Sequence, residues 1–144
     1  MSLRDADIQQ ALKTAADAPG IPGLVVMLAG GNSNSDAYPF SPAFVPLAMT
    51  VGSTIITDSR ATFSNSSSRT EVWAPGSDVK STGHRSDADA ATLSDTSMAC
   101  PHVSVAVALI LIAKPKARPD AVLAEMLEDR YDNAFASLKN GDIN

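Results

Sequence analysis

Residues 96–113 of this chain read TSMACPHVSVAVALILIA, and this stretch decides the fold. From residue 103 onward it is strongly apolar, and Pro115 and Pro119 follow it as helix-ending residues. Its apolar run of about 11 residues is shorter than the roughly 20 that a membrane span requires. We therefore expect a helix that is buried through the centre of a globular domain, and no membrane partner.

Upstream of this helix, the sequence predicts the alternation of helices and strands that defines an α/β fold. Apolar residues recur at spacings of three and four in residues 5–18, which predicts an amphipathic helix ended by Pro19 and Gly20. Residues 23–29, GLVVMLA, read as a strand covered on both faces of a parallel sheet. The remaining elements are strands at residues 47–56 and 71–74, polar excursions at residues 30–42 and 77–94, and a surface helix at residues 120–131.

Length and composition describe one domain, residues 1–144, and exclude several classes of partner. The 11 basic side chains are scattered among 16 acidic ones, for a net charge of −5, so no surface for nucleic acid is expected. Cys100 is the only cysteine, which rules out a disulfide within the chain and suits a buried thiol. The N-terminal segment carries charge from Arg4 and lacks the apolar core of a signal peptide, so we expect no targeting signal in this sequence.

Ser97 is the strongest candidate for chemistry, because it stands at the start of the predicted helix. The unpaired N–H groups and partial positive charge of a helix N-terminus favour a developing anion, which suits a nucleophile at this place. From spacing alone, the commoner role of Thr96 or Ser97 is to cap the helix. The residues by themselves leave both roles open.

Five motifs follow one another along nearly the whole chain. They are LAGGN at residues 28–32, SPA and TVG within residues 41–52, FSN at residues 63–65, APG at residues 74–76 and TSMACPHV at residues 96–103. In this order they resemble the subtilisin-like serine proteases, or subtilases, of the proteinase K and cerevisin branch. The resemblance implies the C-terminal half of a subtilisin-like catalytic domain, an incomplete α/β fold with a mainly parallel sheet flanked by helices.

This resemblance implies a serine endopeptidase, a hydrolase in which Ser97 attacks the peptide carbonyl. The Asn32 side chain and the Ser97 N–H would hold the oxyanion, although a turn residue is the alternative role for Asn32. The resemblance also implies a specificity pocket for a large apolar side chain of the substrate. The residues that would line it are Leu3, Ala29, Gly30 and Gly31.

The family's catalytic aspartate and histidine precede the point at which this chain begins, so the chain reads as a fragment. His102 lies about 140° around the helix from Ser97 and is expected in the core, whereas His84 is expected on the surface. Asp95 and Val105 replace two glycines of the family, and a carboxylate at Asp95 would oppose an oxyanion. The alternative function is therefore a non-catalytic, degenerate or truncated subtilase remnant that at most binds peptides.

The resemblance requires no cofactor, but it implies a structural calcium site. Its ligands would be the carbonyl oxygens of Pro46 and Ala48 and the carboxylate of Glu71, although an exposed glutamate at a strand start needs no metal. The implied partners are a peptide or protein substrate, a propeptide inhibitor and the missing N-terminal half of the catalytic domain. The implied location is secreted or vacuolar.

Overall fold

The computed structural model describes residues 5–16, 24–43, 45–46, 48–68 and 70–128. The three predicted helices and three predicted strands are present with bounds that differ by a few residues, but five strands in a row separate the first helix from the second, and two of these strands were not predicted. The elements are α1 (Asp5–Ala16), β1 (Met27–Ala29), β2 (Met49–Thr54), β3 (Thr70–Pro75), β4 (Val79–Thr82), β5 (Ala90–Leu93), α2 (Thr96–Ala113) and α3 (Pro119–Glu128). The predicted ends of the first and last helices, residues 17–18 and 129–131, lie outside the described residues.

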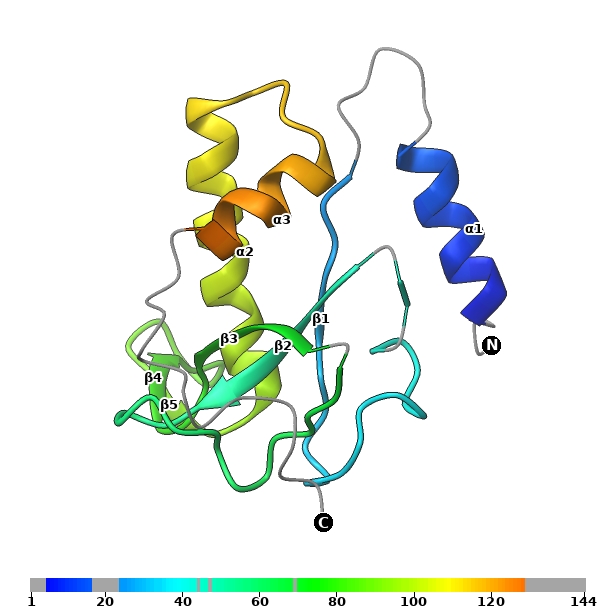
Figure 1. Cartoon of the computed structure of the whole chain (residues 1–144). Helices are drawn as coiled ribbons and strands as arrows, with labels where there is room; N and C mark the ends of the chain where they lie inside the picture. Colours follow the sequence, from blue (N-terminus) through cyan, green and yellow to red (C-terminus); the bar gives the residue numbers. More distant parts are fainter. Residues whose placement is uncertain (1–4, 17–23, 44, 47, 69, 129–144) are drawn as a thin grey trace.

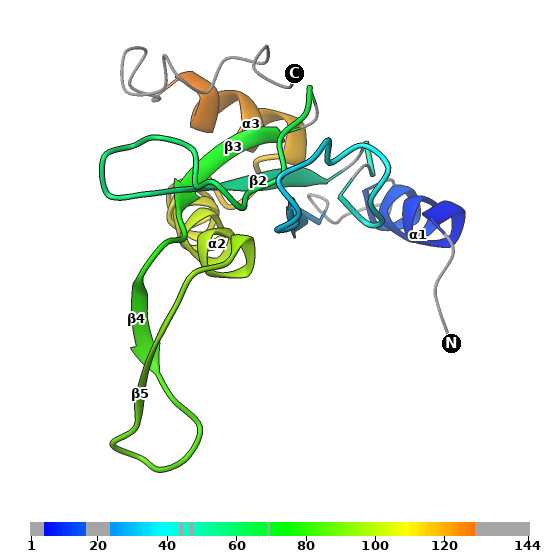
Figure 2. The same ribbon diagram turned by 90° about the horizontal axis from the view of Figure 1, so that it is seen from below.

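A three-stranded parallel sheet in the order β1–β2–β3 forms the centre of the molecule (Figure 1). β2 is the middle strand, and all six of its residues are buried. Met27 of β1 pairs with Met49 of β2, and Thr54 of β2 pairs with Pro75 of β3. α2 and α3 lie on opposite sides of strands β2 and β3 (Figure 2). The prediction of a mainly parallel sheet flanked by helices is therefore confirmed.

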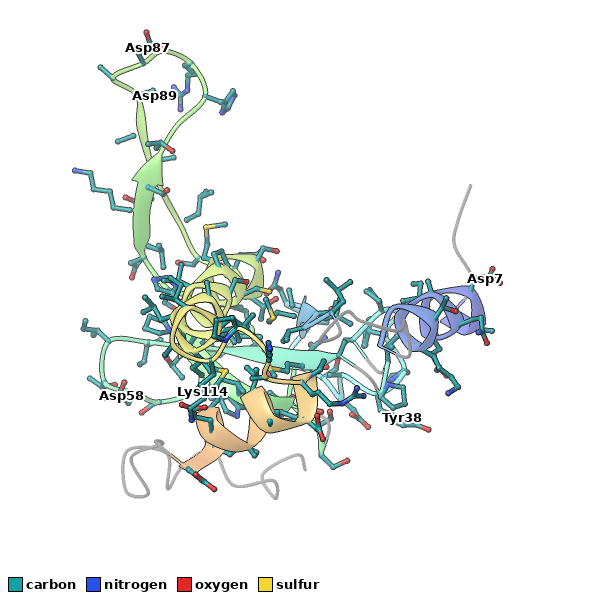
Figure 3. The ribbon with its side chains drawn as sticks, turned by 90° about the horizontal axis from the view of Figure 1, so that it is seen from above. Asp7, Tyr38, Asp58, Asp87, Asp89 and Lys114 are labelled. Atoms are coloured by element: carbon teal, nitrogen blue, oxygen red, sulfur yellow. The ribbon has the colours of Figure 1, made fainter. Side chains whose placement is uncertain are left out.

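The hydrophobic core lies between this sheet and the two helices. Val51 in β2 and Val122 in α3 have no exposed surface, and Val103 in α2 is 3% exposed. At the surface, Lys114 at the end of α2 forms an ion pair of 2.8 Å with Glu125 of α3 (Figure 3). Because Lys114 is largely exposed, burial of the apolar residues contributes far more to the packing of α3 than the charges do.

Burial of α2 is one-sided, so the prediction of a helix surrounded by the domain is wrong for this chain. Val105, Leu109 and Ile112 on its outer side are 60, 62 and 75% exposed. Its buried residues are Thr96, Ala99, Val103 and Val107. The sheet and α3 cover one side only, and no described helix or strand covers the other (Figure 2). The outer side of α2 is therefore an apolar surface.

By length and composition alone, α2 could also cross a membrane, since it has 18 residues and a mean hydropathy of 1.9, with 22% of this window buried. The apolar run of about 11 residues within α2, residues 103–113, is still shorter than the roughly 20 that a membrane span requires. Core helices of globular domains pass the same test. The packing of Ala99 and Val103 against Val51 of the sheet is the contact that a core helix makes.

β1 is shorter and less buried than predicted. Only Met27–Ala29 pair with β2, and all three residues are half-buried, whereas a strand covered on both faces was expected over residues 23–29. The reason is that β1 is an edge strand of the described sheet and that α1 lies to one side of the sheet rather than over it (Figures 1 and 2).

Residues 77–94 form an exposed excursion, as predicted, and they also contain an unpredicted hairpin. β4 pairs with β5 in antiparallel fashion and projects from the rest of the molecule (Figures 2 and 3). Near its tip, Asp89 accepts a hydrogen bond of 3.1 Å from the Arg85 N–H. The segment that joins the two strands is longer than the two-residue turns by which hairpins are predicted from a sequence. The sequence therefore contains no turn motif that predicts this hairpin.

Candidate active site

The predicted catalytic residues lie where the loop after β1 meets the first residues of α2. Thr96, which is 1% exposed, joins the two segments. Its hydroxyl accepts a hydrogen bond of 3.1 Å from the Gly31 N–H, and its own N–H donates to Asn32 Oδ1 at 2.9 Å. The loops at the carboxyl ends of parallel strands are where α/β proteins bind ligands. The fold thus brings Asn32 beside the start of the helix that carries Ser97.

Asp95 binds both of the groups that were predicted to hold an oxyanion. Its Oδ2 accepts a hydrogen bond of 2.6 Å from Asn32 Nδ2, and its Oδ1 accepts one of 2.6 Å from the Ser97 N–H. Asp95 is also the N-cap residue of α2, with the extended backbone that this position requires. The two donors therefore converge on one anion, which is the carboxylate of the chain itself.

These contacts stabilise the charge of Asp95. Burial by itself raises the pKa of this carboxyl group, but hydrogen bonds from the side chain of Ser97, the side chain of Asn32 and the Ser97 N–H outweigh it. The pKa is held below its usual value of 3.8. The carboxylate is therefore ionised at neutral pH.

Asp95→Asn is expected to lower the free energy of unfolding by about 0.5–1 kcal/mol at pH 7, since asparagine caps a helix as well as aspartate but carries no charge. Because the folded pKa lies below the unfolded one, the charge stabilises fully above the usual value of 3.8 and is lost as the pH falls through the folded value. Denaturant unfolding of both proteins between neutral and strongly acidic pH measures this difference. A difference that does not change with pH would contradict it.

Asn65, which the sequence presented only as part of the FSN motif, anchors the loop that carries Asn32. Its side chain has no exposed surface. Its Nδ2 donates to Gly30 O at 3.0 Å, and its Oδ1 accepts from the N–H groups of Ser33 at 2.9 Å and Ser35 at 3.1 Å. One side chain thus fixes the backbone on both sides of Asn32. The spacing of the motif gave no sign of this role.

Packing within the loop explains the two glycines that were predicted to line a specificity pocket. A Cβ on Gly30 would lie 3.2 Å from Val51 O, which is tighter than ordinary contact. Gly31 has a φ of +96°, and a Cβ there would lie 2.6 Å from Asn65 Nδ2. Gly31 is therefore required with or without a substrate, whereas a side chain at Gly30 would need a small shift of the Val51 backbone. The other predicted pocket residues are Ala29, which is half-buried, and Leu3, which lies outside the described residues.

The two histidines and the cysteine differ in exposure and in their contacts. His102 Nδ1 lies 2.9 Å from Met98 O on its own helix, and its side chain is exposed, so the prediction of a core histidine is wrong. It stands on the side of α2 that no described element covers. His84 is exposed near the hairpin tip, as predicted. Cys100 is half-buried, and burial raises the pKa of its thiol, which favours the protonated and less nucleophilic form.

The predicted calcium ligands lie near the start of β2 and β3. Glu71 Oε2 accepts a hydrogen bond of 2.7 Å from the Thr50 N–H, so its carboxylate lies beside the segment that contains Ala48. Ala48 is buried and Pro46 is exposed. Within the described residues no three His, Cys, Asp or Glu side chains gather as a metal site would require. A site made mostly of backbone carbonyl oxygens, as calcium accepts, stays a prediction.

Comparison with known proteins supports the family resemblance that the sequence motifs indicate. Residues 2–140 match the model of the subtilase family. The chain is 41% identical over 134 residues to alkaline serine exoprotease A of Vibrio alginolyticus, which covers 93% of this chain and 24% of that protein. It is 45% identical over 105 residues to an extracellular serine proteinase of a Thermus species, which covers 73% of this chain and 26% of that protein.

A solved structure shares the fold. The crystal structure of a cold-adapted subtilisin-like serine proteinase superposes with a TM-score of 0.78 at 32% identity, over 96% of this chain and 59% of that one. Fold and site thus define the class as a subtilisin-like α/β protein. The chain belongs to the subtilase family, whose members similar to it are named serine proteases. It spans about a quarter of the length of the two curated relatives named above.

Proposed function

We propose that this chain supplies the nucleophile and the oxyanion-binding groups of a serine endopeptidase. The observation that carries the proposal is the convergence of the Asn32 side-chain amide and the Ser97 N–H on one carboxylate. Donors that are held toward a single negative charge are what an acyl-transfer enzyme offers to its tetrahedral intermediate. Membership of the subtilase family supports the same reaction.

In the proposed reaction, Ser97 Oγ forms a bond to the substrate carbonyl carbon while the carbonyl oxygen takes the electron pair and accepts the two hydrogen bonds. The intermediate then expels the amine, and water hydrolyses the acyl-enzyme. The Ser97 proton must pass to a general base and from there to the amine. Because His102 binds its own helix and His84 lies on the hairpin, we assign the base and its orienting carboxylate to the N-terminal half of the catalytic domain.

The same N-terminal half would cover the exposed apolar side of α2. Val105, Leu109 and Ile112 form that side, and burying them would stabilise a complex by about 1.5–3 kcal/mol for each fully buried side chain. The proposed substrate is a peptide or protein, the proposed inhibitor is a propeptide, and the proposed location is secreted or vacuolar. The name of the Thermus relative, an extracellular proteinase, supports secretion.

Labelling with a fluorophosphonate tests this function. We expect weak labelling of the chain alone and a rise of roughly 100-fold or more on mixing with the N-terminal half of the catalytic domain of the Thermus relative, because a general base contributes about that much. Ser97→Ala should remove the label. Ser104→Ala is the matched control, since Ser104 lies on the same helix and only donates to Cys100 O at 3.1 Å. A mixture without Ser97-dependent label would refute the proposal.

The second candidate is a non-catalytic remnant that at most binds peptides. One observation favours it, which is that Asp95 already binds both donors that an oxyanion would need. A remnant predicts that the two halves associate without any labelling of Ser97. Size-exclusion chromatography of the same mixture, followed by the labelling assay, separates the two candidates.

We also propose a structural calcium ion, held by the carbonyl oxygens of Pro46 and Ala48 and by the carboxylate of Glu71. Calcium at about 100 times its Kd is expected to raise the free energy of unfolding by about 2.7 kcal/mol. Glu71→Gln keeps an acceptor for the Thr50 N–H but removes the charge, so its calcium response should be much smaller. Equal thermal midpoints of the original chain in calcium and in chelator would exclude the site.

A further inference from the structure

We propose that the Asp95 carboxylate is an internal occupant of the oxyanion hole, which a substrate carbonyl must displace before Ser97 can react. The inference rests on the proposed function. The Asn32 Nδ2 and the Ser97 N–H each lie 2.6 Å from a different oxygen of this carboxylate. Both donors are therefore engaged before any substrate arrives. Asp95 thus acts against the reaction that its neighbours are arranged to perform.

Backbone contacts on both sides fix the position of Asp95. Its N–H donates to Gly76 O at 2.8 Å, and its carbonyl oxygen accepts from the Met98 N–H at 3.0 Å. A Cβ on Gly76 would lie 2.7 Å from Asp95 O, so the glycine of the APG motif leaves room for this approach. The carboxylate is therefore held against the two donors by the fold itself.

Charge makes this occupant difficult to displace. Hydrogen bonds from N–H groups to a carboxylate are roughly twice as strong as those to a neutral acceptor, and a peptide carbonyl is neutral before attack. As Ser97 attacks, the carbonyl oxygen becomes negative, and an ionised Asp95 beside it opposes that charge. The carboxylate therefore disfavours both the entry of the carbonyl and the transition state.

The same residue stabilises the helix, and a test must separate the two roles. Asp95 caps α2 through its bond to the Ser97 N–H. Asparagine is an equally good cap of the same shape without the charge, and glycine is a tolerated cap without a side chain. Asp95→Asn therefore weakens the occupant while keeping the cap, and Asp95→Gly removes the occupant.

The experiment measures the rate at which a fluorophosphonate labels Ser97 in the original chain, Asp95→Asn and Asp95→Gly. Each protein is assayed alone and mixed with the N-terminal half of the catalytic domain of the Thermus relative. We expect the rate to rise about 10- to 100-fold in Asp95→Gly and by a smaller factor in Asp95→Asn, since restoring one oxyanion donor is worth about 100-fold. In ¹H–¹⁵N spectra, the resonances of the Asn32 side-chain amide and the Ser97 amide should move in both variants.

The outcomes distinguish failure of the inference from failure of the proposed function. If the original chain and Asp95→Gly are both folded and are labelled at the same rate, Asp95 is not an occupant of the oxyanion hole. The proposed serine protease function would be unaffected by that result. Absence of Ser97-dependent label from every protein and mixture would refute the protease, and the occupant with it, leaving Asp95 as a helix cap. If Asp95→Gly does not fold, Asp95→Asn decides, because an unchanged rate and unchanged amide resonances in that variant also refute the occupant.

Discussion

Asn65→Ala is expected to lower the free energy of unfolding by about 2–4 kcal/mol and to abolish labelling of Ser97 in the mixture of the two halves. The Asn65 side chain has no exposed surface and makes hydrogen bonds to Gly30, Ser33 and Ser35. Alanine leaves these backbone groups around a small cavity without their partner. The loop that carries Asn32 would then lose the support that aims its side-chain amide.

Urea unfolding and the labelling assay measure the two parts of this prediction. Asn34→Gly is the matched control, because Asn34 is an exposed residue of the same loop with a φ of 48°, which glycine adopts without strain. Its effect on stability should stay below about 0.5 kcal/mol. An Asn65→Ala protein with the original urea midpoint would show that the loop does not depend on this anchor.

The double substitution Leu109→Lys and Ile112→Lys is expected to reduce aggregation of the chain alone and to weaken its complex with the N-terminal half. In the chain alone both side chains are largely exposed, at 62 and 75%, so the change removes an apolar surface that promotes aggregation and leaves stability almost unchanged. In the complex each lost apolar contact costs about 1.5–3 kcal/mol. The Kd between the halves should therefore rise by a factor on the order of 100 or more.

Light scattering of the chain alone and titration of the N-terminal half against it provide the measurements. Ala121→Lys with Ala124→Lys on the exposed part of α3 adds the same charge at a different surface and serves as the control. If both double variants bind the N-terminal half equally well, the outer side of α2 is not the contact surface.

The sequence predicted best the elements whose pattern is long and whose environment is local to this chain. β2 is confirmed within residues 47–56, because its run of apolar and β-branched residues lies in the middle of the sheet. α2 is confirmed at residues 96–113, since 18 apolar-rich residues before Pro115 leave few alternatives. Neither pattern is periodic, since β2 is buried at every position and α2 is apolar on most sides, so the length of each apolar run and the residues that bound it identify the two elements.

The failures have a common physical cause, which is that burial depends on neighbours that a sequence pattern does not name. Val105 and Leu109 were expected in the core because they are apolar, but no described element covers them. The motifs indicated Asn32 and Ser97 and placed Asp95 near the expected oxyanion, but they did not show that Asp95 bonds to both residues. The hydrogen bond between Asn32 and Asp95 joins residues 63 positions apart, and no local sequence pattern predicts such a bond.

The same distances along the chain set the order in which the site can come into being. The bonds that join the loop after β1 to the start of α2 connect residues 63, 64 and 65 positions apart. Closing so long a loop costs conformational entropy before any contact repays it, so such pairings form slowly compared with helical turns. The first of these bonds can form only after residue 95 has been synthesised. The contact between this loop and the start of α2 therefore forms late in folding, whereas the turns of α2, whose hydrogen bonds are local, form early.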